Sequence, residues 1–224
     1  MSGFLPIRVR KVASVLRGLR EDSGTGPDDV AARVLKRCAA SLMIPLAIIC
    51  RCIVRSGSWP CPWKTHWVFP LFKKKSRSDP ANYRGIHLTA QVSKVAERVV
   101  GESFKSFLEG TEAYGPNQFA YSSGRGTRDA LALCVLQWLI FMDEDLKIAT
   151  YCSDVSGAFD RVSAERLLQK LASKGVHKQI LAIVKDWLSG RTAHVIVDGV
   201  SSISRPLRNS VYQGTVWGPR LWSP

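Results

Sequence analysis

The feature that most constrains this chain is a stretch near its middle, residues 147–161, with the sequence KIATYCSDVSGAFDR. From Ile148 to Val155 the residues alternate as in a β-strand, which delivers Asp154 to the end of that strand just before a turn at Gly157. A carboxylate at the end of a buried strand is costly unless a cation or a donor faces it. Two roles stay open on this stretch alone. In the first, Asp154 holds Mg²⁺ against a phosphate substrate, because Mg²⁺ prefers few carboxylates plus phosphate oxygens. In the second, Asp154 only caps the turn.

The charge of the chain favours a polyanionic partner. Among 224 residues, 32 Lys and Arg stand against 18 Asp and Glu, which gives a net charge of +14. Nucleic acid is the partner that such a balance favours most, with an acidic membrane surface as the alternative. A hydrophobic content of 46% is enough to bury a real core.

The sequence predicts an intracellular protein, in the nucleus or the cytoplasm. Its six cysteines form no CxxC pair, which indicates reduced thiols. The basic N-terminus has the charge of a transit peptide but no signal-peptide core, and apolar residues from Val9 to Leu19 recur at helical spacing. The apolar run from Cys38 to Val54 is short for a membrane span and holds Pro45 and Arg51, so we expect a buried pair of helices there.

The remaining patterns predict an α+β chain. Helices are expected where apolar residues recur every three or four positions, and strands where short β-prone runs end in turns. The predicted helices cover residues 31–40, 45–55, 93–107, 127–141, 163–170 and 180–188. The predicted strands cover residues 67–72, 148–155 and 192–197, with a β-prone run before residue 88. Asp198-Gly199 predicts a hairpin turn, and Gln213-Gly214 a turn that opens a helix at Thr215.

One predicted helix differs from the others. From Ala130 to Phe141 it is apolar almost all round, so we expect it to be buried on every side. Thr127 is the expected N-cap, and Asp129 is expected to support the first turn.

Two groups of basic residues suit a phosphate ligand. The predicted strand 67–72 runs directly into Lys73, Lys74, Lys75 and Arg77. Such a loop grips phosphate or is simply a solvated surface, and for a lone charge run the second reading usually wins. Arg84 lies in a short apolar stretch, where a guanidinium needs a phosphate or a carboxylate as acceptor.

Several segments, in the same order along nearly the whole chain, resemble the reverse transcriptase domain of non-LTR (LINE-type) retrotransposons. They are GTGPDDVAARVLK from Gly24, WKTHWVFPLFKKK from Trp63, NYRGIHLTAQVSKVAERVV from Asn82, NQFAYSSGRGTRDAL from Asn117, YCSDVSGAFDRV from Tyr151, GRTAHVIVDGVSS from Gly190 and VYQGTVWGPRLW from Val211. Each segment alone is a modest signal, and their shared order makes the resemblance strong.

The resemblance implies a fold and a set of partners. The fold would be a polymerase right hand with fingers and the first part of the palm but no thumb. Residues 1–23 would be a helical lead-in, 24–146 a fingers-like region and 147–224 a partial palm. The partners would be an RNA template, a DNA primer and dNTPs, with Mg²⁺ as cofactor; neither a membrane nor a protein partner is implied.

The resemblance also implies roles for single residues. Asp154 would be a catalytic, metal-binding aspartate, whereas Asp160 would only stabilise the turn. Phe159 would lie against the sugar of the incoming nucleotide. The triphosphate would be gripped by Lys73 and Arg84, and the template and nucleotide would be held by Gln213 and Gly214. Further nucleic-acid contacts would come from Lys74, Lys75 and Arg77.

The sequence departs from the family pattern in four places. These polymerases carry a later hairpin with an aromatic-x-Asp-Asp core, yet no Asp follows Asp198 here. Gly85 replaces a Pro, Ala120-Tyr121 replaces Gly-Phe, and Tyr212 replaces a Pro or Trp. With one matched metal aspartate, we expect these residues alone not to polymerise DNA. The alternatives are a non-catalytic nucleic-acid-binding module and an unstable product of a decayed element.

Overall fold

The computed structural model describes residues 6–110, 115–208 and 210–222, apart from the side chain of Ser103. Helices and strands are mixed, as predicted for an α+β chain. The helices are α1 (Val9–Arg17), α2 (Ala32–Arg37), α3 (Ala39–Ser56), α4 (Gln91–Gly110), α5 (Thr127–Asp143), α6 (Ala164–Ser173), α7 (Lys178–Leu188) and α8 (Gly218–Trp222). The strands are β1 (Thr65–Phe72), β2 (Tyr83–Leu88), β3 (Arg191–Val197), β4 (Val200–Ser201) and β5 (Arg205–Leu207), with short 3-10 helices η1 (Cys61–Lys64) and η2 (Pro80–Asn82).

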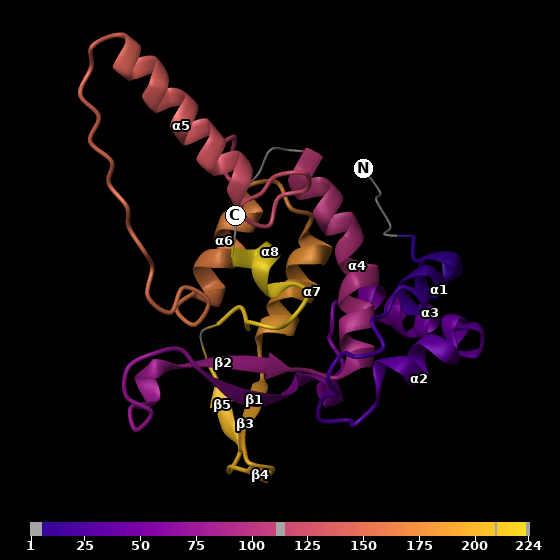
Figure 1. Cartoon of the computed structure of the whole chain (residues 1–224). Helices are drawn as coiled ribbons and strands as arrows, with labels where there is room; N and C mark the ends of the chain where they lie inside the picture. Colours follow the sequence, from indigo (N-terminus) through magenta and orange to yellow (C-terminus); the bar gives the residue numbers. More distant parts are fainter. Residues whose placement is uncertain (1–5, 111–114, 209, 223–224) are drawn as a thin grey trace.

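The first three helices pack beside α4 and bury the first apolar stripe of the chain (Figure 1). Val12 and Leu16 of α1 are fully buried, and Leu19 joins the same core just beyond the helix. This confirms the amphipathic helix that the N-terminal spacing predicts, because a one-sided apolar stripe is stable only against other apolar side chains.

The sequence predicts a new helix that starts near Pro45, but the apolar run after Cys38 does not divide there. The break between helices lies at Cys38, and α3 continues through Pro45 to Ser56. Proline removes one backbone hydrogen bond from a helix. Buried neighbours such as Leu46 offset that loss, because tertiary packing supplies most of the stability of a helix in a folded chain.

The expected burial of α3 holds for one face only. Leu46, Cys50 and Ile53 are buried against other helices, whereas Ile44 and Ile48 are 54% and 52% exposed. Within the described ranges α3 is the one helix long and apolar enough to cross a membrane, a test that core helices of soluble proteins also pass.

A single sheet joins the two halves of the chain. Its order is β2-β1-β3-β4, with β5 also paired to β3. β1 pairs antiparallel with β2 and parallel with β3. The sheet thus takes two strands from the predicted fingers-like region and the other three from the predicted palm region, and α4 and α7 lie above it in Figure 1.

Turn and cap signals are largely confirmed. Asp198 and Gly199 both have positive φ, 49° and 78°, which is the backbone of a two-residue hairpin turn. Ser163 accepts a hydrogen bond from the Arg166 N–H at 3.4 Å and so caps α6. Thr127 is not a cap, because it is the first helical residue of α5, and the Asp129 carboxylate accepts from the Gly126 N–H at 2.7 Å.

The predicted strand from Ile148 to Val155 does not form. The segment is extended but has no strand pairing in the described part of the chain, and Tyr151 and Val155 are 91% and 61% exposed. An alternating pattern becomes a strand only when a neighbouring strand accepts its backbone hydrogen bonds. No described segment lies beside it to do so.

The predicted burial of α5 is wrong as well. None of its described residues is buried, and Leu131, Leu136 and Leu139 are 61%, 56% and 58% exposed. Figure 1 shows α5 pointing away from the body, with the extended segment returning separately. Apolar composition favours burial, but burial needs a second apolar surface, and the described chain brings none against α5.

Candidate functional site

One pocket of about 740 Å³ collects most of the residues that the family resemblance singles out. It lies between the loop that joins β1 to β2, the turn at residues 154–160 and the turn at Gln213. The predicted site residues that line it are Lys73, Lys74, Lys75, Arg84, Asp154, Phe159 and Gln213. Gly214 and Arg77 do not line it. Tyr121 and Asp160, to which the sequence assigns no ligand, also line it.

The lysines of the pocket are presented by an ordered loop. The Lys73 N–H donates to the Asn82 carbonyl at 2.8 Å, which extends the β1–β2 pairing. The Asn82 side chain donates to the Ser76 carbonyl at 2.8 Å, and the Asp79 carboxylate accepts from the Ala81 N–H at 2.9 Å. These bonds fix the backbone, so the lysine side chains leave from defined points.

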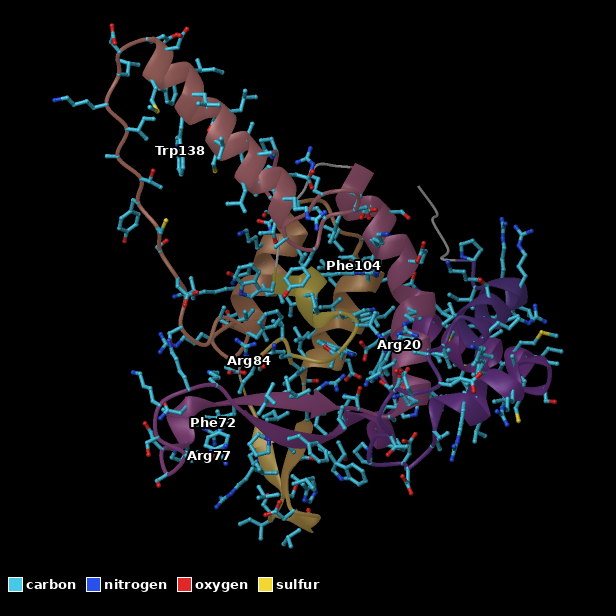
Figure 2. The ribbon with its side chains drawn as sticks, viewed as in Figure 1. Arg20, Phe72, Arg77, Arg84, Phe104 and Trp138 are labelled. Carbon is cyan, nitrogen blue, oxygen red and sulfur yellow. The ribbon has the colours of Figure 1, made fainter. Side chains whose placement is uncertain are left out.

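Arg77 and Arg84 have different surroundings. The Arg77 guanidinium lies 5.2 Å from the centre of the Phe72 ring, a cation–π contact outside the pocket. Figure 2 shows Phe72 and Arg77 together, with Arg84 on the opposite side of the hairpin, nearer the loop before α6. Arg84 and the three lysines are exposed and form no ion pair with another described residue. The pocket therefore holds four cations available to an anion.

The turn at Gln213 is bonded to the strand that carries Arg84. The His87 N–H of β2 donates to the Gln213 carbonyl at 2.9 Å. Gly214 has a φ of +106°, and a Cβ there would lie 2.5 Å from the His87 carbonyl oxygen. Only glycine permits both the conformation and the approach, so its effect on the pocket is to place Gln213.

The backbone just after this turn is bonded to a buried carboxylate of α4. Glu97 of α4 is fully buried, and its Oε2 accepts from the Val216 and Trp217 N–H groups at 2.7 and 3.2 Å. Burial raises the pKa of Glu97, while the Arg191 guanidinium and these N–H donors act to lower it. The sequence analysis did not predict a role for Glu97. A signal was available, because Glu97 lies three residues before Val100 and so places a charged residue on the apolar side of the predicted helix.

Two buried histidines that are 21 residues apart in the sequence, one in β1 and one in β2, are in contact in the folded chain. His66 Nδ1 and His87 Nδ1 are 2.9 Å apart, and Arg191 Nη1 is 2.6 Å from His66 Nε2. Because arginine can only donate, His66 must accept at Nε2, carry its proton on Nδ1 and donate it to His87. Burial and the Arg191 charge lower the pKa of His66 to about 2; burial lowers the pKa of His87 to about 4, although Asp160 opposes that shift.

Aromatic rings form one wall of the pocket. Phe159 stacks on Trp222 of α8 with ring centres 6.0 Å apart, and its carbonyl accepts from the Val211 N–H at 3.0 Å. The rings of Tyr121 and Phe159 lie edge-on to each other, with centres 6.4 Å apart. The aromatic wall and the four cations belong to one cavity, a combination that suits a ligand with both phosphate and planar apolar parts.

The acidic side chains of the pocket are Asp154 and Asp160. The Asp160 N–H donates to the Gly157 carbonyl at 2.9 Å, which confirms the turn predicted there. No three described His, Cys, Asp or Glu residues lie together so as to hold a metal ion. Mg²⁺ takes one or two carboxylates and fills its other positions with phosphate and water. Asp154 and Asp160 could therefore hold Mg²⁺ only together with a bound phosphate and water, and not as a metal centre made of protein ligands alone.

A second cavity, of about 700 Å³, lies between α6, α7 and β5 and contains none of the predicted site residues.

Comparison with protein families settles the class. The family described as reverse transcriptase (RNA-dependent DNA polymerase) matches residues 72–223, more than half of the chain. The chain therefore belongs to the reverse transcriptase family. The match includes all the predicted site residues, from Lys73 to Gly214.

Three of the relatives are mobile-element polymerases of Drosophila melanogaster. The probable RNA-directed DNA polymerase from transposon BS is 28% identical over 219 residues, which cover 97% of this chain and 24% of the relative. The RNA-directed DNA polymerase from mobile element jockey is 28% identical over 218 residues, with the same coverage, and the one from transposon X-element 27%. This confirms the resemblance to non-LTR retrotransposons. The chain spans about a quarter of the length of these relatives.

Proposed function

We propose that this chain carries the nucleotide-binding part of a reverse transcriptase domain, and that its pocket takes the triphosphate of an incoming dNTP. The observation that carries the proposal is the convergence on one cavity of residues from three separate segments of the chain: Lys73 and Arg84 from one hairpin, Phe159, and Gln213. The exposed cations suit a triphosphate, because charge-assisted hydrogen bonds to phosphate are the strong ones. In this proposal Asp154 is the carboxylate that would bind a Mg²⁺ ion, and the phosphates of the nucleotide would supply further ligands to that ion.

Calorimetric titration of the chain with dATP and Mg²⁺ tests the pocket. Lys73→Ala and Arg84→Ala are expected to weaken binding about 10-fold each, since each removes a charged donor. Arg77→Ala is the matched control, because Arg77 packs on Phe72 outside the pocket and its loss should change the dissociation constant less than about 2-fold. Equal effects of all three variants would show that the cations act only through net charge.

We propose further that these 224 residues by themselves do not extend a primer, because Asp154 is the one carboxylate that matches a metal ligand of the family. An RNA template, a DNA primer, dNTPs and Mg²⁺ or Mn²⁺ test this. Extension that persists in Phe159→Ala but disappears in Asp154→Ala would show that Asp154 suffices and would overturn the proposal.

The second candidate is a nucleic-acid-binding module without catalysis. The exposed loop Lys73–Arg77 and the net charge of +14 favour it. RNA binding measured by fluorescence anisotropy is expected to weaken with salt, and the slope should fall when Lys73, Lys74 and Lys75 are neutralised together. Absence of binding at low salt would remove this candidate.

A further inference from the structure

Tyr121 is an aromatic residue of the pocket to which neither the family resemblance nor the chemistry of the cations gives a role. It lies in the loop before α5, lines the pocket and is 54% exposed. Exposed tyrosines are ordinary on a protein surface, but this one lies inside the cavity that contains Lys73 and Arg84.

The ring of Tyr121 is held in place. It meets Phe159 edge-on at an interplanar angle of 89°, and Phe159 in turn stacks on Trp222. Its loop is braced, since the Gln118 side chain donates to the Ala120 carbonyl at 2.9 Å and the Ser122 hydroxyl to the Gln118 carbonyl at 2.9 Å. In an edge-on pair the edge of one ring meets a face of the other, so Phe159 covers at most one face of the Tyr121 ring.

The pocket has two chemical parts. Lys73, Lys74, Lys75 and Arg84 offer charge to phosphates, whereas Tyr83, Phe159 and Tyr121 are the aromatic residues that line it. Tyr83 is engaged by residues outside the pocket, because its ring lies edge-on to Phe72 with centres 5.4 Å apart and its hydroxyl donates to the Arg77 carbonyl at 2.8 Å. A nucleotide has the same two parts, and its base is a planar π-system that stacks on aromatic side chains. With Tyr83 bonded to Arg77 and Phe159 against the sugar, Tyr121 is the aromatic ring of the pocket left for the base.

We propose that Tyr121 stacks on the base of the nucleotide whose triphosphate the pocket binds, and so makes the pocket prefer a nucleoside triphosphate over bare polyphosphate. This rests on the proposed nucleotide-binding function. Stacking of one base on one aromatic ring accounts for about a 5- to 100-fold change in affinity.

The test compares two ligands on the same chain. Calorimetric titrations with dATP and with inorganic tripolyphosphate, both with Mg²⁺, are run on the native chain, Tyr121→Ala, Tyr121→Phe and Tyr121→Leu. We expect Tyr121→Ala and Tyr121→Leu to bind dATP about 5- to 100-fold more weakly and tripolyphosphate within 2-fold of the native chain. Tyr121→Phe keeps the ring and should bind both ligands as the native chain does.

Tyr151→Ala is the matched control, because Tyr151 is 91% exposed and does not line the pocket. It should leave both affinities unchanged. Tripolyphosphate binding also reports whether each variant is folded.

The outcomes separate the two proposals. If Tyr121→Ala and Tyr121→Leu weaken dATP and tripolyphosphate equally, Tyr121 shapes the pocket and the stacking proposal fails. If the native chain binds tripolyphosphate as tightly as dATP, the base is not recognised; the stacking proposal fails while the phosphate site stands. If the native chain binds neither ligand, the nucleotide-binding function itself fails.

Discussion

At the residue scale, Gly214 shows how a motif glycine acts through the backbone. Replacing it by alanine should destabilise the chain by at least about 2 kcal/mol, because the added Cβ overlaps the His87 carbonyl and the φ of +106° strains an L-residue. Urea denaturation followed by tryptophan fluorescence measures the free energy of unfolding.

Gly199→Ala is the control for strain without overlap. Gly199 has a φ of +78°, but nothing lies within 4 Å of an added Cβ. The Gly199→Ala substitution should lower the free energy of unfolding by about 1 kcal/mol. Equal losses in the two variants would show that the approach to His87 does not matter.

The buried histidines predict a pH dependence of stability. His66 and His87 have pKa values lowered to about 2 and about 4 in the folded chain, against 6.5 for an ordinary histidine. Below pH 6.5 the unfolded chain therefore binds more protons than the folded one. The free energy of unfolding should fall as the pH is lowered from 6.5 to 4, by up to about 1.4 kcal/mol per pH unit for each histidine. Above pH 6.5 the contribution of the neutral histidines to stability is fully present.

Urea unfolding at pH 7.5 and pH 5 checks this. His87→Asn removes one titrating group and should reduce the difference between the two pH values. An unchanged difference in that variant would show that His87 does not contribute to the pH dependence.

At the element scale, one carboxylate joins α4 to the segment that precedes α8. Glu97→Ala should lower the free energy of unfolding by about 2–4 kcal/mol, because the Val216 and Trp217 N–H groups would be left without an acceptor. The same variant should weaken dATP binding, since these N–H groups belong to the segment that follows Gln213. Denaturation and calorimetry measure the two effects.

Glu102→Ala is the matched control on the same helix. Its side chain is 49% exposed and lies 3.6 Å from Lys11 in a surface ion pair. Such pairs contribute at most about 1 kcal/mol, so stability and dATP binding should change little. A loss in Glu102→Ala as large as in Glu97→Ala would contradict the role of the buried carboxylate.

At the scale of the whole molecule, the exposed apolar residues of α5 are a liability. Soluble monomers seldom expose large contiguous apolar patches. The 224-residue chain should therefore self-associate as its concentration rises, as measured by size-exclusion chromatography with light scattering. Leu136→Glu with Leu139→Lys should reduce this and change the free energy of unfolding by less than about 0.5 kcal/mol, because both positions are more than half exposed.

Leu171→Glu tests the opposite case. Leu171 of α6 is fully buried, so a charge there should prevent stable folding rather than improve solubility. If the α5 variant loses as much stability as Leu171→Glu, α5 is covered in solution and its exposure is not a property of the folded chain.

The sequence was informative wherever a structure depends on neighbours in the chain. The hairpin turn at Asp198-Gly199, the cap at Ser163 and the amphipathic helices α1 and α4 follow from local propensity and periodicity. The family membership also followed from motifs read in order. Seven of the residues that those motifs single out line one pocket, whereas Gly214 and Arg77 do not, and the functional roles assigned to them stay predictions.

What needed the tertiary structure was every property that depends on a distant partner. The contact of His66 with His87 and the bonds of Glu97 to the segment before α8 join residues that no local pattern connects. The segment around Asp154, the most constraining stretch of the sequence, did not form its strand because no described strand lies beside it, and α5 is apolar yet exposed for the same reason. Periodicity states which side of a segment can be buried, but only the packing of the whole chain decides whether anything covers it.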